Sequence, residues 1–140
     1  MSVHYVETSA LLSIALEGNK VISRALASAP SLISSSLTFV EFERGLLRSR
    51  RDGTLTVAEE SKARRWAREF SNTCYLMELD SEVLERAKLP FKLEPVRTLD
   101  ALHLASIEVL AKKLGWLTVV SCDDRIRENA VALGFHVLPA

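Results

Sequence analysis

The stretch Arg97-Thr98-Leu99-Asp100-Ala101-Leu102-His103-Leu104-Ala105-Ser106 begins an apolar helix that the rest of the chain has to cover. Thr98 is a suitable N-cap, and Gly115 lies where the C-terminal end of this helix is expected. Aliphatic residues between these ends cover most of the helix circumference, so little of it can face water. Asp100 is the exception. Its carboxylate either gains about 0.3 to 1 kcal/mol from the helix macrodipole and nothing more, or belongs to a site shared with other carboxylates.

Outward from this helix, short strands alternate with helices along the chain. We expect strands at 3–6, 31–34, 74–79, 116–121 and 135–138. We expect a helix at 10–16 after caps at Thr8 and Ser9, followed by helices at 21–29, 37–51 and 56–70. A short helix is expected to start at 80–81 and to end by Pro90, and further helices are expected at 99–114 and 123–133. This alternation predicts an α/β fold in which helices cover both faces of a parallel sheet.

The length and composition suit a single domain spanning residues 1–140. The 18 basic and 18 acidic residues cancel, so the net charge does not indicate a nucleic-acid partner, although separated patches could. Cys74 and Cys122 are expected to be buried free thiols, which favours a reducing compartment. We expect a cytoplasmic protein, because the chain shows neither a signal-peptide pattern nor an apolar run approaching about 20 residues.

Two acidic residues, Glu7 and Asp123, follow predicted strands. In parallel sheets, ligands bind beyond the carboxyl ends of the strands, at the point where the strand order reverses. If the first and fourth strands are neighbours there, Glu7 and Asp123 face each other, with Asp100 and Glu41 projecting from helix N-termini beside them. Clustered carboxylates need a cation to stay ionised. Hard oxygen donors suit Mg²⁺ or Mn²⁺, which would support phosphodiester hydrolysis.

Glu41 also has simpler interpretations. It lies three residues after Thr38 and could complete a capping box, or it could pair with Arg44 or Arg48 on its own helix face. Glu43 lies on a different face and is expected to be a solvated charge.

Asp123 could simply cap the helix that follows it, which would leave Asp124 as the functional residue. His103, one turn after Asp100, is more typical of a hydrogen-bonded core histidine than of a metal ligand. Trp66 and Phe70, at helical spacing, are expected to be core residues.

Basic residues are concentrated on two consecutive predicted helices. Those in the first helix share the helical spacing of Glu41 and are Arg44, Arg48 and Arg51. Those in the second are Lys62, Arg64, Arg65 and Arg68. They could form a solvated face with pairs such as Glu60 with Arg64, or they could hold a phosphate backbone, or a partner protein, beside the acidic site.

Four segments occur in a characteristic order: residues 5–11, 36–41, 97–105 and 120–126. Together they resemble the PIN domain family, specifically the VapC-type toxins of toxin-antitoxin pairs. The resemblance implies a three-layer fold with a parallel sheet of about five strands in the order 3-2-1-4-5. It also implies a magnesium-dependent ribonuclease that is inhibited by a cognate antitoxin and is usually a homodimer.

The same resemblance assigns roles to individual residues. The acidic set of the family corresponds to Glu41, Asp100 and Asp123, with Thr8 or Ser9 as an auxiliary residue. The family has aspartate at the position of Glu7, whose extra methylene moves the carboxylate outward by about one bond. Mg²⁺ demands near-ideal octahedral geometry, and a displacement on the order of 1 Å can cost about 100-fold in rate.

Two functions therefore compete. The first is a metal-dependent endoribonuclease toxin in which Glu7, Asp100 and Asp123 bind the metal, with Glu41 assisting. The second is a catalytically attenuated domain that binds RNA or an antitoxin. A phosphotransfer enzyme is disfavoured, because no second aspartate follows Glu7 at a phosphoacceptor spacing.

Overall fold

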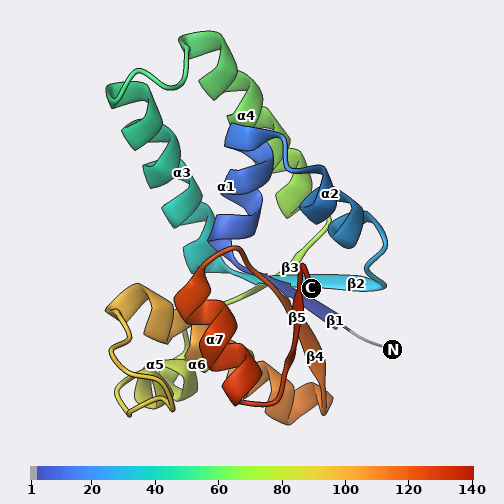
Figure 1. The fold of residues 1–140 in the computed structure, drawn as a ribbon, viewed down its shortest axis with the longest axis vertical. Helices are drawn as coiled ribbons and strands as arrows, with labels where there is room; N and C mark the ends of the chain where they lie inside the picture. Colours follow the sequence, from blue (N-terminus) through green and yellow to red (C-terminus); the bar gives the residue numbers. More distant parts are fainter. Residues whose placement is uncertain (1–2) are drawn as a thin grey trace.

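Five parallel strands form one sheet in the order β3-β2-β1-β4-β5 in the computed structural model, which describes residues 3–140. Figure 1 shows the sheet between two groups of helices. The strands are β1 (Val3–Val6), β2 (Ser31–Ser35), β3 (Tyr75–Met77), β4 (Leu117–Val120) and β5 (His136–Leu138). The α/β class, the parallel pairing and the strand order are confirmed, although β3, β4 and β5 are shorter than predicted.

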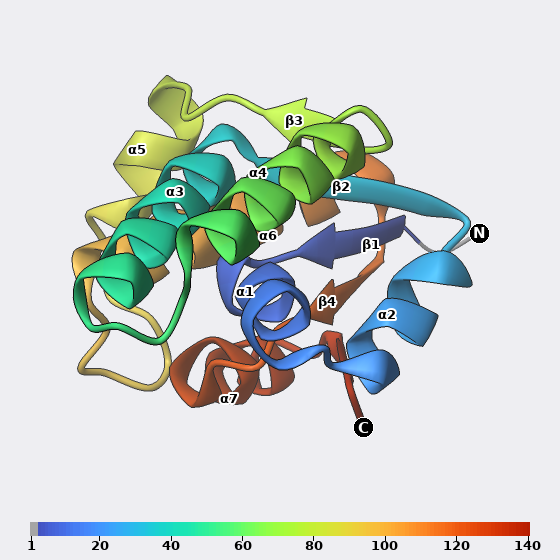
Figure 2. The ribbon, with the colours of Figure 1, turned by 90° about the horizontal axis from the view of Figure 1, so that it is seen from above.

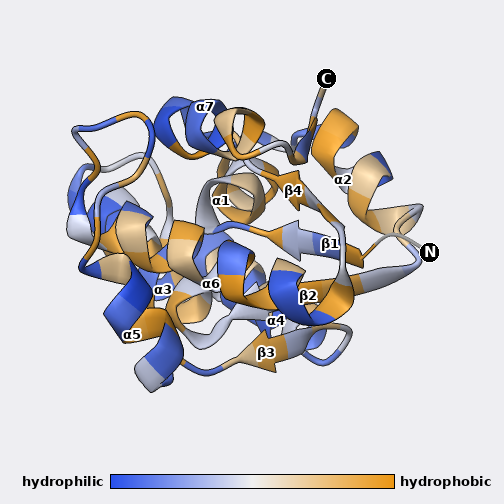
Figure 3. Ribbon diagram, turned by 90° about the horizontal axis from the view of Figure 1, so that it is seen from below, coloured by the Kyte–Doolittle hydropathy of each residue, from blue (hydrophilic) through white to orange (hydrophobic). Residues whose placement is uncertain are grey.

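Helices cover both faces of the sheet. One layer contains α1 (Thr8–Glu17), α2 (Lys20–Ala27), α3 (Ser36–Arg51) and α4 (Val57–Ser71). The other contains α5 (Ser81–Ala87), α6 (Thr98–Leu114) and α7 (Asp124–Ala132). Figure 2 shows the first layer from above, and Figure 3 shows the second from below with its apolar and polar residues coloured.

Strand alternation divides the core between these two layers. Successive side chains of a strand point to opposite faces, so Tyr5 packs among α6 residues while Val6 packs among residues of α1 and α3. Trp66 and Phe70 pack against the core on the α1–α4 side of the sheet, as expected of core residues, and their ring centroids lie 5.4 Å apart.

The central helix α6 ends as predicted but begins differently. The N–H of Gly115 donates to Ala111 O, and its φ of 88° is one that glycine adopts without steric cost. The predicted N-cap, Thr98, is wrong, because Thr98 already lies in the helix and Arg97 occupies the cap position without a side-chain hydrogen bond. Burial is nearly complete between Ala101 and Leu110, whereas Leu99 near the start is 47% exposed.

The N-termini of two other helices also differ from the prediction. Glu7, rather than Thr8 or Ser9, is the N-cap of α1, and its carboxylate accepts the N–H of Ser9, two residues further along the chain. The N-cap of α3 is Ser35, which places Glu41 in the second turn rather than at the helix N-terminus.

Both cysteines are free thiols. Cys74 is partly buried, but Cys122 is exposed at the end of β4, so its predicted burial is wrong. Over residues 3–140, no helix combines the length and apolar character needed to cross a bilayer.

Candidate active site

The carboxyl ends of β1 and β4 lie side by side, as predicted. Val6 pairs with Val120, and the Glu7 N–H donates to Val120 O at 3.0 Å, so the two strands stay paired until the chain turns into its helices. Figure 2 shows these adjacent strands running in the same direction, with α1 beginning at their ends. This edge is where the strand order reverses, and the four predicted acidic residues lie around it.

Glu7 is held by serine side chains from both strand ends, and we call Glu7, Ser9 and Ser121 the Glu7 cluster. Its Oε1 accepts from Ser9 Oγ at 2.5 Å and from Ser121 Oγ at 2.6 Å. Its Oε2 accepts the Ser9 N–H at 3.0 Å. The residue is only 5% exposed. Both oxygens of this carboxylate are therefore already engaged by the protein.

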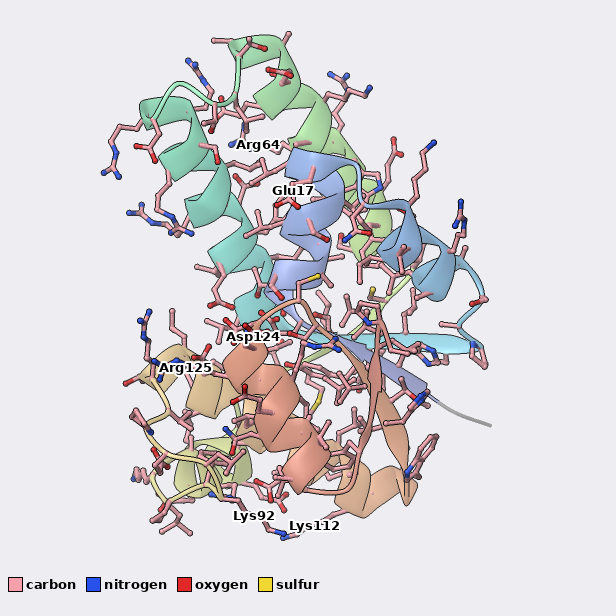
Figure 4. All side chains as sticks on the ribbon, in the orientation of Figure 1. Glu17, Arg64, Lys92, Lys112, Asp124 and Arg125 are labelled. Carbon is pink, nitrogen blue, oxygen red and sulfur yellow. The ribbon has the colours of Figure 1, made fainter. Side chains whose placement is uncertain are left out.

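Asp123 lies directly after the Glu7 cluster and begins α7. Its Oδ1 accepts the Ile126 N–H at 3.1 Å, and its own N–H donates to Ser121 Oγ at 3.0 Å. Asp123 is therefore a helix cap, as the simpler interpretation expected, and its Oδ2 accepts no hydrogen bond from the described residues. Asp124 is exposed in the first turn of α7, where Figure 4 shows it beside Arg125.

Glu41 is held from the opposite side, and we call Tyr5, Thr8, Glu41 and His103 the Glu41 cluster. Its Oε1 accepts from Thr8 Oγ1 at 2.6 Å and from His103 Nε2 at 2.5 Å. On the far side of the imidazole, the Tyr5 hydroxyl lies 2.8 Å from His103 Nδ1. Both contacts reach the same oxygen of Glu41, and the described residues give Oε2 no hydrogen bond.

The surroundings of Glu41 favour its ionised form. Burial pushes its pKa upward, but the hydrogen bond and charge of His103, the hydrogen bond from Thr8 and the charge of Arg48 together hold the pKa below its usual value. The predicted capping box with Thr38 is wrong, since Thr38 instead accepts from Ser34 Oγ. The prediction that His103 is a hydrogen-bonded core histidine is confirmed.

Asp100 lies in the first turn of α6, as predicted, and is influenced by all three other carboxylates. Burial raises the pKa of Asp100 most, and the negative charges of Asp123, Glu7 and Glu41 raise it further, against an opposing effect of His103. The four acidic side chains thus share one electrostatic environment, and a cation would lower the cost of ionising them together.

The donor chemistry of this edge fits a hard divalent cation. Within residues 3–140, no three Asp, Glu, His or Cys side chains are arranged as a ready-made metal-binding group. Mg²⁺ does not require one, because it keeps several waters and binds through one or two carboxylates together with substrate phosphates. Asp100, Asp123 and the second oxygen of Glu41 are the donors that the fold leaves available.

The basic residues of the α3–α4 hairpin divide into two groups. Arg64 on α4 points towards α3 (Figure 4), where it pairs with Glu43 at 2.9 Å and with Glu60 at 3.4 Å. The Glu60–Arg64 pair is confirmed. The side chain of Glu43 is 43% exposed, as expected of a solvated charge, and Arg64 also pairs with it from the neighbouring helix. Arg44 and Arg48 are exposed on another face of α3 and form no ion pair within the described part of the chain.

Sequence reasoning missed two residues that shape the site, Tyr5 and Ser121. Tyr5 was assigned only to a strand, although strand alternation could have directed it towards α6 and hence towards His103. Ser121 was assigned to the end of a strand, and only the pairing of β1 with β4 brings its hydroxyl to Glu7.

Comparison with protein families shows that the family described as PIN domain matches residues 4–132. The chain is 32% identical over 142 residues to Ribonuclease VapC46 of Mycobacterium tuberculosis, and the match covers 99% of this chain and 98% of that protein.

Solved structures share the fold. A toxin-antitoxin complex from Klebsiella pneumoniae matches with a TM-score of 0.66 and 16% identity, covering 98% of each chain. The crystal structure of Mycobacterium tuberculosis VapC20, described as a sarcin-ricin loop cleaving toxin, matches with a TM-score of 0.65 and 20% identity over 94% of this chain and 95% of that chain. DNA-bound VapBC from Salmonella typhimurium matches with a TM-score of 0.64 and 19% identity, covering 98% and 97%.

Proposed function

The chain belongs to the PIN domain family, and we propose that it is a metal-dependent endoribonuclease toxin that hydrolyses RNA phosphodiester bonds. The observation that carries this proposal is the gathering of four carboxylates at the ends of β1 and β4, where the negative charges of Asp123, Glu7 and Glu41 raise the pKa of Asp100. The whole-length similarity to Ribonuclease VapC46 supports the same activity.

In this proposal, the acidic residues hold one Mg²⁺ or Mn²⁺. Asp100 and Asp123 are direct ligands, Glu41 contributes its second oxygen, and Glu7 contributes negative charge close to them. The bound cation would acidify a water molecule and neutralise charge that develops on the phosphate. The hydrogen bonds to Glu41 Oε1 fix that carboxylate before the substrate arrives, and those to Glu7 fix the junction of β1 and α1.

The substrate backbone would be held by exposed cations on α3. Arg44 and Arg48 are exposed one turn apart, and the charge of Arg48 already acts on Glu41. Arg51 lies further along the same helix and faces Asp52 at 3.5 Å. Phosphates bound here would lie beside the acidic residues, which is the placement that cleavage of a phosphodiester requires.

Membership of the family suggests the partners. We propose that a cognate antitoxin inhibits the chain and that the chain works as a homodimer. We also propose that residues 1–140 form a single domain and that the protein is cytoplasmic. The structural relatives include a toxin-antitoxin complex and DNA-bound VapBC, which supports the antitoxin.

The test of the proposed function is RNA cleavage by purified protein with added Mg²⁺ or Mn²⁺. Asp100→Asn should lower the cleavage rate by about 100-fold or more, because it removes the carboxylate at the centre of the acidic group. Asp52→Asn, an exposed aspartate at the end of α3, is the matched control and should cleave normally. Cleavage that persists in Asp100→Asn without added metal would falsify the proposal.

A second function is favoured by one observation, which is that both carboxylate oxygens of Glu7 accept hydrogen bonds from the protein. Because both of its oxygens accept hydrogen bonds from Ser9 and Ser121, Glu7 is poorly available to a cation. The chain would then be an attenuated PIN domain that binds RNA or its antitoxin and cleaves slowly.

Glu7→Asp separates the two functions. In an attenuated domain, restoring the shorter family side chain should raise the cleavage rate and the toxicity to cells, because the carboxylate would be withdrawn from the serine hydroxyls. If Glu7→Asp leaves both measurements unchanged, the attenuated function is excluded.

A further inference from the structure

A buried aromatic residue is connected to the Glu41 carboxylate through one histidine. The Tyr5 hydroxyl lies 2.8 Å from His103 Nδ1, and His103 Nε2 lies 2.5 Å from Glu41 Oε1. Tyr5 is 0% exposed and His103 is 1% exposed, so bulk water has no access to take over either hydrogen bond. Both ring nitrogens of His103 are therefore engaged by protein groups, one from β1 and one from α3.

The ionised state of Glu41 decides the direction of its hydrogen bond to His103. An ionised carboxylate can only accept, so His103 Nε2 donates to Glu41. The Tyr5 hydroxyl lies 2.8 Å from Nδ1 and is the hydrogen-bond partner of the second ring nitrogen. The imidazole is therefore held at both nitrogens, which fixes the orientation of the ring towards Glu41.

Resting on the function proposed above, we propose that Tyr5 and His103 are positioning residues that hold Glu41 by one oxygen and leave the other for the divalent cation. Thr8 Oγ1 donates to the same Oε1 at 2.6 Å, so two side chains of the Glu41 cluster, Thr8 and His103, converge on one oxygen of this carboxylate. Tyr5 acts on Glu41 only through His103, because no hydrogen bond joins Tyr5 to Glu41 within the described residues.

The hydrogen-bond directions can be tested without metal. In metal-free, ¹⁵N-labelled protein, histidine nitrogen shifts report which ring nitrogen carries the proton, and His103→Gln identifies the signals of His103 against those of His4 and His136. We expect the proton on Nε2. Tyr5→Phe should move the Nδ1 signal, because that nitrogen loses its hydrogen-bond partner. A ring without a proton on Nε2, or an Nδ1 signal that Tyr5→Phe does not move, overturns the inference.

The positioning role is tested by Mn²⁺ affinity, measured by electron paramagnetic resonance. His103→Leu should weaken binding by about 10-fold or more. His103→Gln, whose amide can donate from near the Nε2 position, should retain most of the affinity. Tyr5→Phe should weaken binding by roughly 2- to 10-fold, but should have no effect in the His103→Gln background, because the two residues act in series. Thermal unfolding of each variant checks that the fold is intact.

The outcomes separate this inference from the function on which it rests. Wild-type affinity in His103→Leu, or an equal effect of Tyr5→Phe in both backgrounds, overturns the positioning role while leaving the ribonuclease function in place. A wild-type protein that neither binds Mn²⁺ nor cleaves RNA overturns both.

Discussion

The Glu41 cluster and the Glu7 cluster place the same chemical group in two different states. Glu41 is anchored through Oε1 alone, by a threonine and a buried histidine. Glu7 is anchored through both oxygens, by two serine hydroxyls and a backbone N–H. Glu41 therefore keeps one oxygen without a hydrogen bond, whereas both oxygens of Glu7 are engaged at the start of α1. A carboxylate with one oxygen free of hydrogen bonds can still bind a cation, whereas a carboxylate with both oxygens engaged serves as a structural cap. The residue type, glutamate, is the same in both cases.

The largest expected effect compares charge removal in the two clusters. Glu41→Gln should lower the RNA cleavage rate by about 100-fold, because it removes an ionised group that the site stabilises. Glu7→Gln should lower it by clearly less, since the Glu7 oxygens are engaged by the protein. The measurement is the kcat/KM for cleavage with Mg²⁺.

Glu43→Gln is the matched control for this comparison, because Glu43 lies on the same helix but pairs with Arg64. It should cleave at the wild-type rate. An equal loss in Glu7→Gln and Glu41→Gln would show that both clusters supply ligands, and the distinction drawn from their hydrogen bonds would be wrong.

A smaller effect concerns the stability that each cluster contributes. Ser121→Ala should lower the free energy of unfolding by about 1 to 3 kcal/mol, because it takes a donor from the buried Glu7 carboxylate. Thr8→Val should cost less, since Glu41 retains His103 and its side chain is 20% exposed to water. Urea unfolding at neutral pH measures both. A larger loss in Thr8→Val would reverse the ranking of the two clusters.

The smallest expected effect is on the stability of the metal-free protein and concerns Asp100. Its pKa is raised, so the folded protein holds this proton more tightly than the unfolded chain does. The folded state therefore loses stability as the pH rises from the usual pKa of aspartate to the raised pKa, and the loss is complete above the raised pKa. In metal-free protein at pH 7, Asp100→Asn should therefore stabilise the fold by up to about 1 kcal/mol, a limit set by solvent screening of this half-buried group.

The gain in Asp100→Asn should disappear as the pH falls below the usual pKa of aspartate, where the wild-type carboxyl is neutral in both states. Added Mg²⁺ should stabilise the wild-type protein and not the variant. Thermal unfolding with and without Mg²⁺ at both pH values provides the measurement. A variant that is less stable at pH 7 without metal would contradict the raised pKa.

The layered fold could be predicted because its signals are local. Apolar runs in α6 and the alternation of strands with helices carry the three-layer arrangement, and the Thr56–Glu59 capping box marks the start of α4. Cap positions were less predictable. Thr98 and Thr8 are both good N-caps by residue type, yet each lies inside its helix because the preceding residue takes the extended cap conformation.

The candidate site was predictable only as a set of acidic residues. Glu7, Glu41, Asp100 and Asp123 do gather at the edge where β1 and β4 end, but their roles stay a prediction. The hydrogen bonds that distinguish Glu41 from Glu7 join residues more than thirty positions apart in the chain. No pattern of spacing encodes such contacts, because they depend on how the two helix layers meet the sheet edge.

The junction between β1 and α1 supplies both clusters from five consecutive residues. Tyr5 and Thr8 serve Glu41, while Glu7 and Ser9 form the other cluster. Inserting or deleting one residue here would exchange which side chains reach each acid, without altering any residue elsewhere. Length variation during evolution should therefore be excluded from residues 5–9, even where single substitutions are tolerated.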